Sequence, residues 1–222
     1  MSKLPGVPAP CGDISGLVRE WVSGSLKRLG IPRLTGVLLH RPDQLLSPQG
    51  EELFQALVRL TQQGMVEKIG VSIYDPSELD ALFSKYHFDL VQAPFNVFDQ
   101  RLLASGWLRR LRDAGVEVHT RSAFLQGLLL MTAPNRPKQF DRWAPLWGKW
   151  DQWLKEQSLT PLQACLGFVS AHQEIDSVVV GVDNVRQLQE IVRAADTKDV
   201  AVPRSLVTED PQLVNPSNWP KV

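Results

Sequence analysis

The sequence has few cysteines, no excess of charge of either sign and no long apolar run. Its two cysteines, Cys11 and Cys165, stand in no metal-ligand spacing and are expected to remain reduced thiols. Lys plus Arg and Asp plus Glu both number 24, which argues against a polybasic nucleic-acid or membrane-surface binder. The apolar runs are too short for a transmembrane helix, and the N-terminus lacks a signal-peptide core. These absences predict a cytoplasmic protein.

Short β-rich runs recur along the 222 residues, which are long enough for one sizeable domain. Their near-continuous apolar character fits strands covered on both faces, as in a parallel sheet. The predicted strands are Leu34 to Leu39, Val66 to Ser72, Phe88 to Gln92, Val116 to Arg121 and Ser177 to Gly181.

Amphipathic segments with helix-start signals lie between these runs. Ser47-Pro48 and Asp75-Pro76 each place a capping residue before a proline, and Glu78 stands at the capping-box position of the second. Further helices are expected to start at Asp13, Asp99, Thr160-Pro161 and Asn184, the last with Leu188, Ile191 and Val192 on its buried face.

Alternation of strands and helices with short loops predicts an α/β fold with a parallel sheet. Five strands are clear, and SKLP at the start is a candidate end of a sixth. A closed (β/α)₈ barrel needs eight strands and about 250 residues. An open doubly wound sheet accommodates the strand number, but its Gly-rich phosphate loop is missing. Residues 201–222 are expected to form a C-terminal tail, irregular from about Pro203.

Residues 135–157 interrupt the alternation and hold four of the seven tryptophans. The favoured interpretation is an amphipathic helix that packs its indoles on the sheet. The alternative is an aromatic surface that faces a substrate or a second subunit.

Active sites of parallel barrels lie at the carboxyl ends of the strands. That rule selects five polar residues, namely Lys3, His40, Ser72, Gln92 and Arg121. By position alone, a histidine at a strand end such as His40 is more often structural than catalytic. The other histidines, His87, His119 and His172, are expected to be structural.

Four segments, taken in their order along the chain, favour a catalytic role for His40 over a structural one. LLHRPDQ, GMVEKIGVSIYDPSEL, FDLVQAPFNVFDQR and SVVVGVDNVRQLQEI together resemble the aldo-keto reductase family, with its bacterial members as the nearest match. The resemblance covers most of residues 1–200 and implies a parallel (β/α) barrel of TIM type. It further implies reduction of an aldehyde or ketone with NADP or NAD, of which the family favours NADP. The family's catalytic groups are an aspartate, a tyrosine that donates the proton, a lysine that lowers the pKa of that tyrosine, and a histidine that orients the carbonyl.

The resemblance assigns two of these catalytic groups. His40 matches the family histidine and Lys3 matches the lysine. Ser72 and Gln92 match residues that contact the carboxamide of the cofactor, although Ile73 stands where the family usually has asparagine. Arg121-Ser122 replaces the common tyrosine-serine pair, and the Arg121 guanidinium is expected to stack on the nicotinamide. The adenosine phosphate end is expected to contact Gly181, Asn184, Gln187 and Glu190, where the free N–H groups of a helix start can receive phosphate.

The chain begins at this lysine, so the resemblance leaves no position for the family aspartate and tyrosine. Tyr74 and Tyr86 do not align with the tyrosine. We therefore expect a truncated member, with five to six of eight strands, the first two βα units absent and weak or no turnover. The alternative function is a non-catalytic nicotinamide-nucleotide binder or a fragment that a partner completes. Open barrel edges predict self-association, and a small carbonyl compound is the expected substrate.

Overall fold

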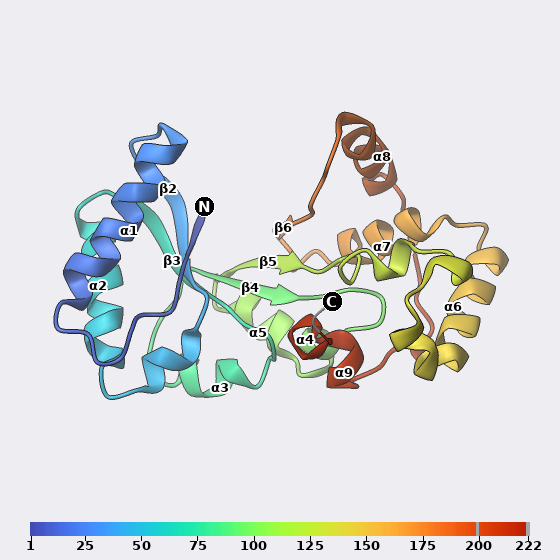
Figure 1. Ribbon diagram of the computed structural model, residues 1–222, viewed down its shortest axis with the longest axis horizontal. Helices are drawn as coiled ribbons and strands as arrows, with labels where there is room; N and C mark the ends of the chain where they lie inside the picture. Colours follow the sequence, from blue (N-terminus) through green and yellow to red (C-terminus); the bar gives the residue numbers. More distant parts are fainter. Residues whose placement is uncertain (199, 221–222) are drawn as a thin grey trace. The chain divides into compact units, whose positions relative to one another are not determined.

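The computed structural model describes residues 1–198 and 200–220. Within these described residues, six strands form one open parallel sheet, and their order in the sheet follows their order in the chain (Figure 1). The strands are β1 (Ser2–Leu4), β2 (Leu34–Leu39), β3 (Val66–Ser72), β4 (Leu90–Pro94), β5 (Glu117–Arg121) and β6 (Ser177–Val178). The predicted α/β class, the parallel sheet and the sixth strand in SKLP are confirmed.

Of the five predicted strands, β2 and β3 have the predicted ends, β5 starts at Glu117 rather than Val116, and β4 and β6 differ more. β4 starts at Leu90 rather than Phe88, because the Asp89 carboxylate accepts the backbone N–H of Ile69 at 2.8 Å where a strand pair would begin. The last strand was predicted to reach Gly181 but ends at Val178.

The chain divides into two compact units, which are described separately. The first comprises Met1–Ala93 and Trp107–His119, and the second comprises Pro94–Gly106 and Thr120–Val222. The predicted boundary at residue 200 stays a prediction. Helices of the first unit are α1 (Ile14–Leu29), α2 (Gly50–Gln62), α3 (Glu78–Phe83) and α5 (Trp107–Asp113). Helices of the second are α4 (Arg101–Ala104), α6 (Ala144–Glu156), α7 (Pro161–Ser170), α8 (Val185–Ala195) and α9 (Pro211–Val214).

Three of the predicted helix caps are confirmed. Asp13 accepts the N–H of Gly16, Thr160 forms a capping box with Gln163, and Asn184 accepts the N–H of Gln187. These bonds satisfy backbone donors that a helix start leaves unpaired.

The other predicted helix starts are displaced. Ser47 does not cap α2, because residues 42–46 form a 3₁₀ turn and α2 begins after Gln49. Asp75 accepts the N–H and hydroxyl of Ser77 and so closes a turn before α3 begins at Glu78. Asp99 stands two residues before α4 and accepts the N–H of Arg101.

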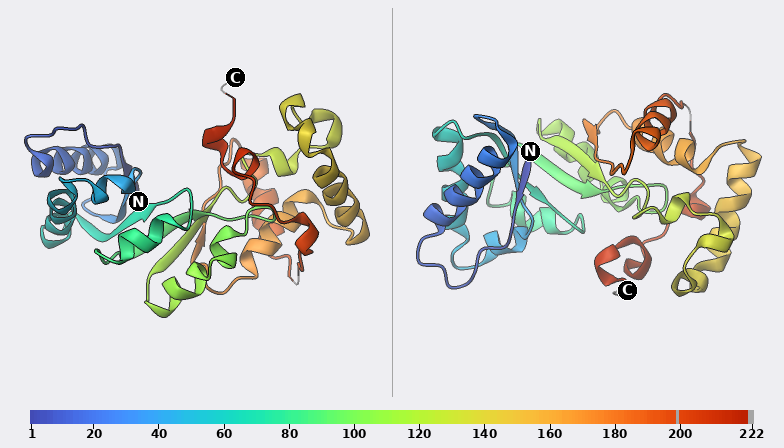
Figure 2. Two further views of the ribbon diagram at one scale, coloured as in Figure 1. Left: turned by 90° about the horizontal axis from the view of Figure 1, so that it is seen from below. Right: turned by 45° about the horizontal axis from the view of Figure 1, so that its top comes forward.

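The core of the first unit lies between its strands and its helices. α1 and α2 pack against each other, and the views of Figure 2 show them side by side. On one face of the sheet, the side chain of Leu90 lies where Gly36 and Gly70 have none. A Cβ at Gly36 would stand 2.9 Å from Leu90 Cδ2, and one at Gly70 would stand 2.1 Å from the Leu90 carbonyl oxygen. Glycine at both positions therefore lets one leucine span three strands.

The tryptophan-rich segment of the second unit forms core, as the favoured interpretation predicted. Trp147, Trp150 and Trp153 of α6 are buried. The Trp147 ring lies 5.1 Å from that of Phe98, and Trp150 stacks on Trp153 at 5.5 Å. Three of the four indoles are therefore not available as a surface for a substrate or a second subunit.

α8 differs from its prediction. The apolar face expected to be buried is exposed, with Val185 71% accessible and Leu188 and Val192 also exposed. The predicted tail is less irregular than expected, because its described part contains α9 and buries Leu213 and Val214. Residues 221–222 of the tail lie outside the described residues.

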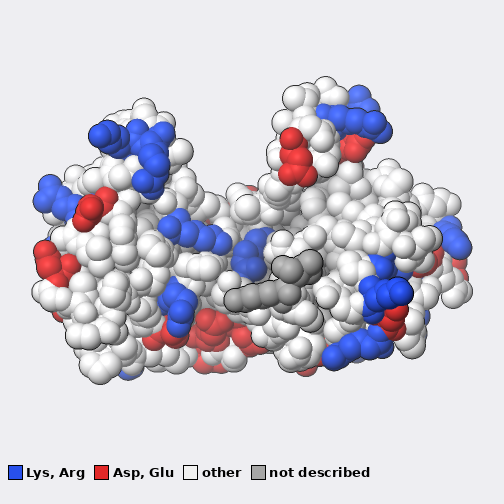
Figure 3. Space-filling model, in the orientation of Figure 1, with Lys and Arg blue, Asp and Glu red and all other residues white. Residues whose placement is uncertain are grey.

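The surface charge and the apolar character of the helices agree with the balanced charge and short apolar runs of the sequence. Figure 3 shows basic and acidic side chains interspersed over the face drawn. Among the described residues, no helix has the length and apolar character needed to cross a membrane.

Candidate active site

The strand register places four of the predicted residues on one face of the sheet in the first unit. Lys3 pairs with Leu38, Leu38 with Gly70, and Gly70 with Leu90. Side chains alternate along a strand, so His40, Ser72 and Gln92 lie one layer further along on the same face. The predicted cluster at the carboxyl ends of β1 to β4 therefore exists as a structural unit.

Ser72 links this cluster to the first strand. The Lys3 ammonium donates a hydrogen bond to the Ser72 hydroxyl at 3.2 Å. Ser72 and Gln92 are buried, whereas Lys3 and His40 are exposed. The cluster thus has a buried floor of Ser72 and Gln92 and an exposed rim formed by the Lys3 ammonium and the His40 imidazole.

A tyrosine joins the cluster that sequence reasoning had excluded from the catalytic role. The Tyr74 hydroxyl lies 3.4 Å from Nε2 of His40, and the two rings are 6.1 Å apart at 60°. Tyr74 follows Ser72 by two residues, so its position at the end of β3 is the signal that could have identified it. Alignment to the family discarded that signal.

Five of the six remaining residues predicted to bind the cofactor line a cavity of about 710 Å³ in the second unit. This volume falls in the range of small-molecule sites. Arg121 and Ser122 line it together with residues around the start of α8. The predicted residues that line the cavity are Arg121, Ser122, Gly181, Gln187 and Glu190. Asn184 does not line it but caps α8, accepting the N–H of Gln187 at 2.9 Å.

Sequence reasoning missed the buried asparagine that holds one wall of this cavity. The Asn96 amide donates to the Ser122 carbonyl at 3.0 Å, and its oxygen accepts the N–H groups of Phe98 and Asp99. Ser122 has φ of 60°, a left-handed conformation that is unusual for a residue with a side chain. The bond from Asn96 therefore supports a strained turn after β5.

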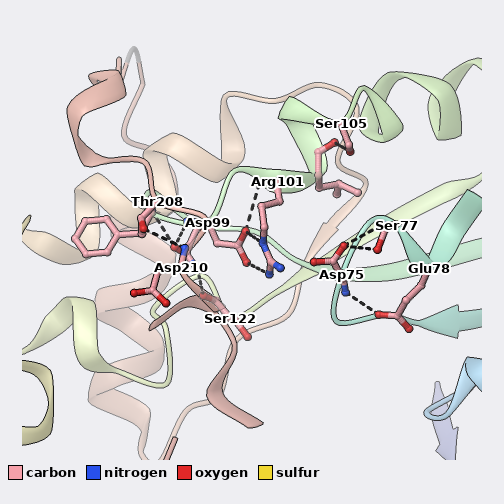
Figure 4. Close-up of polar contacts among 12 residues, drawn as sticks. Asp75, Ser77, Glu78, Asp99, Arg101, Ser105, Ser122, Thr208 and Asp210 are labelled. Carbon is pink, nitrogen blue, oxygen red and sulfur yellow. Dashed lines mark hydrogen bonds and ion pairs between the residues drawn. The ribbon is translucent and has the colours of Figure 1, made fainter. Parts of the chain in front are cut away.

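An ion pair completes the support behind Asn96. Arg101 binds Asp99 through two hydrogen bonds, both of 2.8 Å, and both side chains are largely buried (Figure 4). This forked geometry is the strongest form of the arginine–carboxylate contact. Through these bonds, the segment from Asn96 to Arg101 supports the loop that lines the cavity.

A second polar cluster lies in the first unit, on β3 and β5. Glu117 accepts hydrogen bonds from Lys68 and, at 2.6 Å, shares one with His119 Nε2. The bond from Lys68, followed by that from His119, lowers the pKa of Glu117 below its ordinary value. His119 is buried in this network, and His172 bonds the Phe168 carbonyl at 2.9 Å between aromatic rings. These contacts within the fold fit the structural role expected of both histidines.

The described part of the chain offers neither a metal-binding group of side chains nor, at Cys165, a reactive thiol. Its His, Cys, Asp and Glu side chains form no group that could hold a metal ion. Cys165 is fully buried, and burial raises the pKa of its thiol, so it is not a nucleophile at neutral pH.

Comparison with known proteins agrees with this arrangement. The family model described as Aldo/keto reductase family matches residues 7–203. A Bacillus subtilis protein named as the uncharacterized oxidoreductase YqkF is 24% identical over 192 residues, which are 82% of this chain and 61% of that protein. The L-glyceraldehyde 3-phosphate reductase of Escherichia coli O157:H7 is 26% identical, over 84% of this chain and 61% of the relative. The chain thus spans about three fifths of the length of these relatives.

A solved structure shows the same fold. The aldo-keto reductase AKR11C1 from Bacillus halodurans, in its holo form, superposes with a TM-score of 0.69 at 19% identity. The match covers 94% of this chain and 73% of the solved chain, so the six strands correspond to part of a TIM-type barrel. Since the family model spans most of the sequence, the chain belongs to the aldo/keto reductase family.

Proposed function

We propose that this protein reduces an aldehyde or ketone to an alcohol with NADH or NADPH. The observation that carries the proposal is the cluster of Lys3, His40 and Ser72 at the strand ends, on the face that also holds Gln92. A reduced nicotinamide, when bound, supplies hydride to the carbonyl carbon.

Each unit, taken by itself, has polar groups that suit one part of a nicotinamide nucleotide. In the first, the buried Ser72 hydroxyl and Gln92 amide offer donors and acceptors that suit a carboxamide. In the second, the cavity presents the Arg121 guanidinium and lies beside the start of α8, both of which suit phosphate. The residues present therefore fit a nicotinamide nucleotide.

His40 and Lys3 have separate parts in the reaction. The His40 imidazole donates a hydrogen bond to the carbonyl oxygen and so orients the substrate for attack. Lys3 provides positive charge next to Ser72 while negative charge develops on that oxygen.

A second candidate function is nucleotide binding without turnover. The exposure of Lys3 and His40 favours it, since water weakens electrostatic stabilisation of a transition state. This second candidate function includes the case in which a segment of a partner protein completes the site. The exposed apolar face of α8 and the open sheet edge at β6 support such an association, including association between copies of this chain.

The test separates binding from reduction. NADH and NADPH binding is measured by fluorescence, and turnover by loss of NADPH absorbance with 4-nitrobenzaldehyde. We expect binding and slow turnover in the full chain, and loss of turnover without loss of binding in His40→Ala. His87→Ala is the matched control, because His87 is exposed and lies outside the cluster. Binding with no turnover would favour the second candidate, and absence of binding would refute both.

A further inference from the structure

The cavity of the second unit carries more negative than positive charge in its lining. Among the described residues, its charged side chains are those of Arg121, Asp183 and Glu190, whose formal charges sum to −1. Arg121 ends β5, Asp183 lies directly before the residue that caps α8, and Glu190 lies within α8. An anionic ligand in this cavity therefore meets two carboxylates and one guanidinium.

The turn before α8 holds Asp183 in place. The side-chain oxygen of Gln187 accepts the backbone N–H of Asp183 at 2.8 Å, and Asn184 accepts the N–H of Gln187 at 2.9 Å. Two backbone donors near the start of α8 are therefore bonded by side chains of the same turn. A phosphate that used either donor would displace a side chain, and at the Asp183 N–H it would also lie close to the Asp183 carboxylate.

The arginine of α8 that lies nearest to these carboxylates in the sequence is bound to one of them at the surface. Nε of Arg186 donates to Glu190 at 2.9 Å, one helical turn further along. The Arg186 side chain is 87% exposed and is not part of the cavity lining. Among the described residues, Arg121 is therefore the one cation that lines the cavity.

We propose that Asp183 and Glu190 make this cavity selective for NADH over NADPH. The selectivity rests on the proposed function, in which the cavity takes the adenosine phosphate part of the nucleotide. A carboxylate only accepts hydrogen bonds, and the ribose hydroxyls of NADH are donors. The 2′-phosphate of NADPH replaces one of these donors with a charge of about −1.5 to −2, which the two carboxylates repel. The preference for NADP that the family resemblance implies is therefore reversed in this chain.

A preference for NADH that came from the shape of the cavity would behave differently from one that came from charge. Repulsion between charges weakens in roughly 0.5 M salt, where the screening length falls to about 4 Å. It also weakens when an amide of the same size replaces a carboxylate. A cavity too narrow for a 2′-phosphate would discriminate equally well after either change. Salt and amide substitution therefore separate the two causes.

The experiment measures the Kd of NADH and of NADPH for the full chain by fluorescence, and that of AMP and of adenosine 2′,5′-bisphosphate by competition with NADH. At low salt we expect NADH to bind roughly tenfold more tightly than NADPH, and AMP more tightly than the bisphosphate by a similar factor. Asp183→Asn and Glu190→Gln should each reduce these ratios about threefold, and the two free-energy changes should add in the double variant. Asp196→Asn is the matched control, because Asp196 ends the same helix and does not line the cavity.

Each outcome supports or overturns the selectivity. A parent chain that binds NADPH as tightly as NADH, or more tightly, would overturn it while the proposed reduction stands. A preference for NADH that persists in high salt and in both amide variants would assign the discrimination to shape and would also overturn the role of the two carboxylates. A salt-sensitive preference for NADH and AMP without turnover of 4-nitrobenzaldehyde would support the selectivity and refute the reduction. Absence of all nucleotide binding would refute both.

Discussion

Phenylalanine substitution at two tryptophans of α6 isolates the contribution of one indole N–H. Trp147 and Trp150 lie three residues apart on the buried face, 5% and 0% exposed. The Trp147 N–H donates to the Phe140 carbonyl at 3.1 Å. The Trp150 N–H is buried and has no hydrogen-bond partner among the described residues. The same substitution therefore removes a bonded donor in one case and an unbonded one in the other.

The expected magnitudes follow from these contacts. Loss of indole volume destabilises both variants by about 1–2 kcal/mol, through lost transfer free energy and a small cavity. Trp147→Phe also breaks the bond to Phe140 and leaves a buried carbonyl, which costs about 1–3 kcal/mol more. Trp150→Phe removes a buried unpaired donor and regains a similar amount. We expect a loss of roughly 2–5 kcal/mol for Trp147→Phe and a change within about 1 kcal/mol for Trp150→Phe.

Guanidinium denaturation followed by far-UV circular dichroism measures the difference. Tryptophan fluorescence is unsuitable, because the substitutions change the chromophore. If both variants have the same m-value, their unfolding free energies can be compared directly. Equal destabilisation of the two variants, or a larger loss at Trp150, would refute the hydrogen-bond argument.

Three further predictions concern charge and the cavity wall. Glu117→Gln should lower the unfolding free energy by about 1 kcal/mol or less at neutral pH, since Lys68 is partly exposed. The pKa of Glu117 in the native protein is lowered, so the stability that this carboxylate contributes is present above its ordinary pKa of 4.5 and is lost as pH falls through the native pKa. If Glu117→Gln still lowered the unfolding free energy at pH 2 in urea titrations, this argument would be contradicted. Asp183→Lys should strengthen NADPH binding relative to NADH roughly tenfold, because Asp183 lines the cavity and repels a 2′-phosphate; parallel changes for both nucleotides in fluorescence titrations would be evidence against it. Asn96→Ala should destabilise the protein by about 2–4 kcal/mol and weaken nucleotide binding, since it removes two buried hydrogen bonds and one that is partly buried. Thermal melting and the same titrations check it, and unchanged binding would show that the turn at residue 122 does not depend on Asn96.

The parallel sheet was predictable because its strands carry a local signal. Runs of largely buried residues such as Leu34 to Leu39 mark strands covered on both faces, and the register then brings the ends of β2 and β3, which precede His40 and include Ser72, side by side. Helix starts were predictable where a side chain bonds the first turn directly, as at Thr160. They were displaced where the same kind of residue closes a separate turn first, as Asp75 does.

Long-range contacts could not be predicted from local patterns. The contact between Tyr74 and His40 joins residues 34 positions apart, and no spacing rule links them. Asn96 has the composition of an ordinary turn residue, and only the fold shows that it supports the loop after β5. The exposed face of α8 has the sequence of a buried one, because hydrophobic periodicity indicates that a helix is amphipathic and not what covers it.

Leu90 covers Gly36 and Gly70 on one face of the sheet, and this packing limits which substitutions these positions can accept. An alanine at residue 36 would contact the end of the Leu90 side chain, so shortening Leu90 to valine would relieve the clash. An alanine at residue 70 would meet the Leu90 backbone oxygen, and no side-chain change at residue 90 would accommodate it. A side chain at residue 36 should therefore be tolerated when Leu90 shifts or is shortened, whereas residue 70 should remain glycine in functional descendants of this sequence.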